Sequence, residues 1–202
     1  NETVSGNQSV AIGSAAGRYA LNSVEDIWIG SNAGTYAGTG ASGESRKNIG
    51  IGVQAGRKLG SGSSVASTGN VAIGNDAMGE VATGDYNVAI GWGAASGATA
   101  AGDENISIGY LAGKVSTGNY NVVMGGGAAL AATSMTNSVI IGRQAVGVGV
   151  MTGSDNTIVG YLAGKDYVGG RMTAIGYYAG GGVSADMGDG GFYGGARAGF
   201  KA

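Results

Sequence analysis

The stretch NVAIGNDA at positions 70–77 returns as NVAIGWGA at positions 87–94. Both read aliphatic, any residue, aliphatic, glycine, two residues of any kind, alanine. Aligned on this pattern, the 202-residue chain contains eleven copies, about 16 to 22 residues apart. One short motif at such regular spacing is typical of a solenoid, in which each repeat forms one coil. The central glycines of the copies are Gly13, Gly30, Gly52, Gly74, Gly91, Gly109, Gly125, Gly142, Gly160, Gly176 and Gly195.

Two aliphatic columns precede these glycines, one at three residues and the other at one residue before them, as in Val71 and Ile73. The columns differ by two residues, which is the period of a β-strand. We therefore expect a short strand before each glycine, with both aliphatic columns facing the interior. An alanine follows each glycine by three residues, where we expect a tight corner. These alanines are Ala16, Ala33, Ala55, Ala77, Ala94, Ala112, Ala128, Ala145, Ala163, Ala179 and Ala198.

Asparagine, serine or aspartate stands four residues before most of the glycines, as at Asn70 and Asn87. We interpret these as polar turn residues that bracket the strands. The predicted fold is therefore all-β, a β-solenoid or β-roll of about eleven coils that forms a single repeat domain over residues 1–202.

The composition excludes several classes of function. The chain has 45 Gly and no Pro, Cys or His, so triad hydrolysis and zinc chemistry lack their usual residues. A net charge of -2 without charge runs argues against nucleic-acid binding. We expect no cofactor, no metal, no membrane span and no signal peptide. Because the first residue is not Met and the repeat starts at once, we expect a piece of a longer protein.

The repeat offers an aliphatic strand on only one side of each coil, and the rest of the coil is small or polar. A lone coil would therefore cover its isoleucine and valine columns poorly. A parallel homotrimer, intertwined or side by side, would cover them and remove exposed sheet edges. A face-to-face dimer or a two-layer monomeric roll is the alternative.

The stretches at 70–74, 87–91 and 156–164 resemble the N-x-A-I-G-x-x-A-G repeats of bacteriophage tail-fibre proteins. They are also similar to the repeats in the head domains of trimeric autotransporter adhesins. The first resemblance implies a homotrimeric fibre segment of the virion, joined to other fibre or tail proteins at its ends, that attaches to host-surface polysaccharide. The second implies a bacterial cell-surface adhesin. These coils are longer than the adhesin repeat, so we favour the phage fibre.

Exposed aromatic residues are the candidate ligand site, because rings on a rigid scaffold are platforms for sugar rings. Four of them directly follow a repeat glycine, and Trp28 takes a mid-strand position that should point away from the isoleucine column. The alternative is that the rings cover a seam between chains or shield neighbouring glycines. The candidate glycan-stacking residues are Trp28, Trp92, Tyr110, Tyr161 and Tyr177.

Catalytic residues are not expected. A glycosidase would need paired carboxylates, and we interpret the acidic pairs of this chain as solvated turn residues. The Gly-x-Gly strings lack the following helix that a phosphate loop requires, and regular Thr-x-Thr ladders for ice binding are missing. The acidic pairs are Glu25 with Asp26, Asp103 with Glu104, and Asp186 with Asp189.

Overall fold

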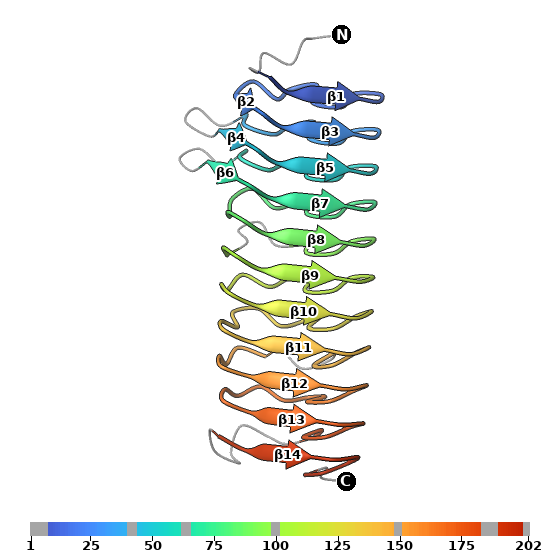
Figure 1. The fold of residues 1–202 in the computed structure, drawn as a ribbon, viewed down its shortest axis with the longest axis vertical. Coiled ribbons are helices and arrows are strands. Elements are labelled where there is room, and N and C mark those ends of the chain that lie inside the picture. The colour runs from blue at the N-terminus through green and yellow to red at the C-terminus, as the bar shows by residue number, and fades with distance from the viewer. Residues whose placement is uncertain are drawn as a thin grey trace. The chain divides into compact units, whose positions relative to one another are not determined.

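The computed structural model describes residues 8–39, 44–61, 66–97, 102–147, 151–182 and 190–199. Over these residues the fold is all-β, without a helix, and its short strands stack in parallel as the coils of a β-solenoid (Figure 1). This confirms the predicted fold class. The chain divides into two compact units, Asn1–Glu104 and Asn105–Ala202, called here the N-terminal and C-terminal units.

The N-terminal unit stacks one strand per coil in the order β1, β3, β5, β7, β8. Neighbouring strands pair in parallel and in register, so that Ala72 lies beside Ala89 and Ile73 beside Ile90. A second, shorter ladder joins β2, β4 and β6. The bounds are β1 Val10–Ile12, β2 Ser23–Val24, β3 Ile27–Ile29, β4 Ser45–Arg46, β5 Ile49–Ile51, β6 Ser67–Thr68, β7 Val71–Ile73 and β8 Val88–Ile90.

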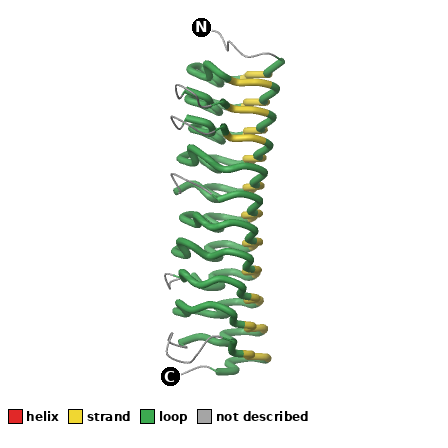
Figure 2. Tube along the Cα trace, turned by 90° about the vertical axis from the view of Figure 1, so that its left-hand side faces the viewer, coloured by secondary structure: helices red, strands yellow, loops and turns green. Residues whose placement is uncertain are grey.

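The C-terminal unit repeats the arrangement with β9 to β14, again parallel and in register. Figure 2 shows the main strands of each unit along one side of the coils, with turns forming most of the rest. The bounds are β9 Ile106–Ile108, β10 Val122–Met124, β11 Val139–Ile141, β12 Thr157–Val159, β13 Thr173–Ile175 and β14 Phe192–Gly194.

The repeat glycine forms the corner after each strand for two physical reasons, both visible at Gly74. Its φ of 130° lies in a region that L side chains rarely adopt. A Cβ at this position would also lie 2.5 Å from the carbonyl oxygen of Gly91 in the next coil. The stacked corners therefore require glycine in successive coils. In the coils from β3 to β13 the alanine three residues later is fully buried, as at Ala77 and Ala94.

The facing of the strands is the reverse of the prediction. The middle residue of each strand from β3 to β13 in the two main ladders points inward and is buried, as at Ala72 and Ile158. The two aliphatic columns on either side of it face outward and are half-buried or exposed. The expectation that these columns fill the interior was therefore wrong.

The interior is narrow, and its residues are matched in size across neighbouring coils. Trp28 fills a space that three glycines leave, because a Cβ on Gly34, Gly50 or Gly56 would lie 2.2, 2.6 or 2.8 Å from the indole ring. The buried core clusters of the two units consist largely of alanine, valine, isoleucine and methionine. Each unit thus fills its own interior. A layer that covers the outer aliphatic columns would have to come from outside the coil.

The asparagines that bracket the strands form side-chain ladders, most of whose members are buried. The Oδ1 of Asn48 accepts hydrogen bonds from Asn70 N at 2.8 Å and Asn70 Nδ2 at 3.0 Å. The Oδ1 of Asn70 accepts the same pair from Asn87 at 2.9 and 3.1 Å. In the C-terminal unit, Asn121 binds Asn105 in the same way at 3.0 and 2.9 Å. These bonds satisfy backbone donors that the coil turns would otherwise bury unpaired.

Candidate functional site

The outer face of the main strands is rich in apolar side chains, because it carries both aliphatic columns from β1 to β11 and one of them in β12 and β13. In the N-terminal unit Ile12, Ile51 and Ile90 are exposed, and in the C-terminal unit Ile106 and Ile175 are exposed. We call these columns the aliphatic face of each unit. Contiguous exposed apolar surface of this kind commonly marks a contact with another macromolecule.

Trp28 does not belong to any surface site. It points away from the outer isoleucine columns, as expected, but that direction leads into the core, where the side chain has no exposed area. Its indole Nε1 donates a hydrogen bond to Ser23 Oγ at 3.4 Å. The prediction that Trp28 presents an exposed ring is wrong, because the inward column is the middle one.

The other predicted aromatic residues lie on the surface. Trp92 in the N-terminal unit and Tyr110 in the C-terminal unit are exposed, each directly after its corner glycine. Tyr161 and Tyr177, at the same position of their coils, are exposed as well.

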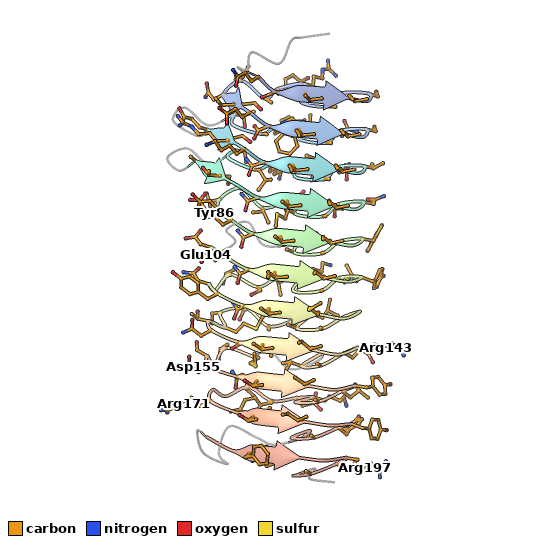
Figure 3. All side chains as sticks on the ribbon, viewed as in Figure 1. Tyr86, Glu104, Arg143, Asp155, Arg171 and Arg197 are labelled. Atoms are coloured by element: carbon orange, nitrogen blue, oxygen red, sulfur yellow. The ribbon has the colours of Figure 1, made fainter. Side chains whose placement is uncertain are left out.

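The structure brings Tyr161 and Tyr177 together. Their rings stack with centroids 5.7 Å apart and an interplanar angle of 26°. Arg143 lies over the Tyr161 ring at 5.8 Å, and Arg197 lies over the Tyr177 ring at 6.0 Å. Figure 3 shows both labelled arginines at the same lateral edge of the C-terminal unit. We call Arg143, Tyr161, Tyr177 and Arg197 the Arg–Tyr ladder.

The arginines of the ladder were not predicted, although a signal existed. Arg143 stands directly after Gly142, in the column that holds Tyr161 and Tyr177, and Arg197 lies two residues after Gly195. A search of that column for cations as well as aromatics would have found Arg143.

Tyr178 and Lys165 extend the ladder on one side. Tyr178 meets Tyr177 edge to face at 5.4 Å, and Lys165 Nζ lies 5.8 Å from the Tyr178 ring centroid. The hydrogen bond with Tyr178 and the nearby Asp166 carboxylate, 3.4 Å away, raise the pKa of Lys165. This lysine is therefore a persistent but locally compensated charge.

The N-terminal unit has a smaller cluster of the same kind at a different corner. Tyr19 and Tyr36 stack at 5.4 Å with an interplanar angle of 11°, and Arg18 lies 5.1 Å from the Tyr19 centroid. Sequence reasoning missed this cluster too. It has one arginine where the Arg–Tyr ladder has one at each end.

The first acidic pair does not form a joint site. Glu25 is exposed, with Lys47 Nζ at 3.9 Å, whereas Asp26 is buried and accepts a hydrogen bond from Ser23 Oγ. Asn48 N and Nδ2 donate to Asp26 Oδ1 at 2.8 and 3.2 Å. Burial raises the pKa of Asp26, and the hydrogen bonds oppose that shift.

The second pair, Asp103 and Glu104, is exposed, and Asp103 Oδ1 accepts a hydrogen bond from Asp85 N at 2.9 Å. The third pair, Asp186 and Asp189, lies outside the described residues. Among the residues that the structure describes, no group of carboxylates is arranged to hold a metal ion.

The same part of the chain contains no helix that could cross a bilayer. In comparisons with known proteins, the chain matches no family model, no curated protein and no solved structure.

Proposed function

We propose that the chain is a structural segment of a phage tail fibre that assembles as a parallel homotrimer, extends the fibre and contributes to attachment to host-surface glycans. The observation that carries this proposal is the aliphatic face, which repeats in both units and which no layer of the described residues covers. The resemblance of the repeats to tail-fibre repeats supplies the biological setting, the virion.

The assembly proposal rests on the cost of leaving this face in water. Burying the exposed part of one such isoleucine yields about 1 kcal/mol at the usual area coefficient. The face presents one or two partly exposed aliphatic side chains in each coil from β1 to β13. A second copy of the chain carries the same face at the same coil spacing, so parallel copies match it along its length. Because each unit already fills its own interior, side-by-side packing of closed solenoids is favoured over intertwining.

The attachment proposal rests on the exposed rings. Trp92 and Tyr110 extend from corners just beyond the strands. Arg143, Tyr161 and Tyr177 of the Arg–Tyr ladder occupy the same column of the C-terminal unit, and Arg197 lies one residue further along its coil. These side chains lie past the corner glycines, outside the strand face that assembly would cover. A fibre of this design would present rigidly spaced aromatic and cationic groups along its length.

The molar mass in solution tests the assembly. We expect light scattering to give three times the chain mass of 19.5 kDa at micromolar concentration. The double variant Ile51→Lys/Ile90→Lys places a charge at two exposed positions of the aliphatic face. Its mass should fall to that of one chain, because assembly would desolvate each lysine in the interface. The matched control Tyr86→Lys, at an exposed corner, should remain trimeric. A single-chain mass for the unaltered protein at all concentrations would refute the proposal.

A further inference from the structure

The Arg–Tyr ladder presents an unusual combination of groups. We propose that it binds an acidic saccharide, a glycan chain whose carboxylate or sulfate groups contact Arg143 and Arg197. The inference rests on the proposed glycan attachment and deepens it by naming the ligand class and the residues.

The stacking order determines which parts of the rings face solvent. Each tyrosine has a neighbour on both faces, Arg143 and Tyr177 for Tyr161, and Tyr161 and Arg197 for Tyr177. A sugar ring therefore cannot lie flat on either tyrosine. Because both side chains remain more than two-fifths exposed, their ring edges and phenol hydroxyls form the outer surface.

That outer surface is rich in hydrogen-bond donors and carries positive charge. The face of an aromatic ring is its negative part and the edge its positive part. Here the faces are turned toward guanidinium groups and toward each other, so ring edges and phenol O–H donors remain for a ligand. Guanidinium groups add N–H donors and never accept hydrogen bonds. The ladder is thus complementary to an anion with several acceptor oxygens.

Within the described residues, neither the Arg143 nor the Arg197 guanidinium group has a carboxylate within 4.0 Å that would cancel its charge. Asp166, which lies beside the ladder, pairs with Lys165. Both arginines are exposed, so bidentate binding of a carboxylate needs no rearrangement of a buried pair.

The spacing suits a chain rather than a single ion. The ladder residues follow β11 to β14 in register, with Ile141 beside Val159, Val159 beside Ile175, and Ile175 beside Gly194. Three strand spacings separate the two arginines, a distance of about 14 Å. One small anion cannot contact both guanidinium groups, whereas an oligosaccharide with an acidic group on successive sugars can.

Calorimetry on the full chain tests the inference with three probes of matched length: a polyuronate oligosaccharide, a sulfated oligosaccharide and a neutral glucan oligosaccharide. We expect at least one acidic probe to bind and the neutral one not to bind. The acidic probe that binds more tightly identifies the anionic group as carboxylate or sulfate.

Variants then locate the site. The double variant Arg143→Gln/Arg197→Gln should weaken binding of the acidic probe about 100-fold, roughly tenfold per lost charged contact. The single variant Arg171→Gln removes an exposed arginine of the same unit at a different corner (Figure 3) and should change binding less than about twofold, because salt screens distant charges. Unchanged thermal midpoints would establish that the variants fold.

Three results would overturn the inference: no acidic probe binds the folded chain, the ladder variant binds as well as the unaltered chain, or Arg171→Gln weakens binding equally. Binding of the neutral probe alone would overturn the acidic ladder and leave glycan attachment standing. A trimeric mass without saccharide binding would leave only the fibre role.

Discussion

Neighbouring residues of the same three-residue strand differ sharply in burial in this molecule. In β8, Ala89 is fully buried while Ile90, the next residue, is more than one-third exposed. In this coil the larger and more apolar side chain is outside, whereas other coils bury large middle residues such as Trp28 and Ile158. The room for a middle residue depends on the residues around it, as the three glycines around Trp28 show. Burial here follows available volume rather than hydrophobicity. The outer columns are then free to serve contacts between molecules.

The largest expected difference in stability between a buried and an exposed position is that between the two tryptophans. Trp28→Ala should destabilise the chain by about 3–5 kcal/mol, because the indole fills a space lined by glycines that have no side chains to fill the cavity. Trp92→Ala removes the same atoms from an exposed corner and should cost less than about 0.5 kcal/mol. Denaturant unfolding of both variants measures the difference. Equal losses would contradict the assignment of inside and outside.

The asparagine ladder is the polar counterpart of the inner column. Asn70→Ala should cost about 1–3 kcal/mol or more, because it leaves the buried donors of Asn87 without their shared acceptor. Asn75, which is exposed and has no positive φ, provides the control. Asn75→Ala should change the unfolding free energy by no more than about 0.5 kcal/mol. A ladder variant as stable as this control would show that the buried amides contribute little.

Asp26 occupies the position that Asn48 and Asn70 fill in the following coils. Its replacement should have a smaller effect on stability, and that effect should depend on pH. Its pKa is raised by burial, so above about pH 4 the unfolded chain loses this proton before the folded chain does. Stability from this group therefore falls as pH rises through the interval up to the folded pKa.

Asp26→Asn should remove this loss, because an amide can accept from Asn48 without carrying a charge. The stability advantage of the variant over the unaltered chain should grow from pH 4 to pH 7, as measured by thermal unfolding of both proteins. An advantage that is constant or shrinks with pH would contradict a raised pKa in the folded state.

The repeat itself was readable from the sequence because its causes are local. A corner with φ near 130° accepts only glycine, and the buried alanine column tolerates little larger, so both leave invariant columns. The strand period is equally local. From these columns follow the parallel β-solenoid and the location of each main strand.

Which side chains of each strand point into the coil could not be predicted from the sequence in the same way. A period of two separates two faces but does not say which is inside, and the usual association of aliphatic residues with the interior favoured the wrong one. Trp28 shows why, since its burial depends on Gly34, Gly50 and Gly56, two of which lie in the next coil. Size matching across coils is a property of the stack rather than of any one repeat.

The Arg–Tyr ladder was partly readable. Its tyrosines stood out as exposed aromatics, but their pairing depends on which coils are adjacent, and Arg197 reaches the ladder from a different offset in its coil. The burial of the asparagines was not predicted, because a polar residue beside a strand usually marks a turn at the surface. Their burial becomes favourable only when identical neighbours above and below supply hydrogen-bond partners.

Thiol labelling of single-cysteine variants tests the central claim, that the aliphatic face is outside the coil and inside the assembly. The chain has no cysteine of its own. Ala89→Cys reports on the interior, Ile90→Cys on the aliphatic face of the same strand, and Tyr86→Cys on an exposed corner.

We predict that the Ala89 variant is protected at every protein concentration and that the Tyr86 variant always reacts freely. The Ile90 variant should react freely when dilute and become protected as the trimer forms. Rapid labelling at position 89, or an Ile90 variant that reacts like the Tyr86 variant at all concentrations, would contradict the account.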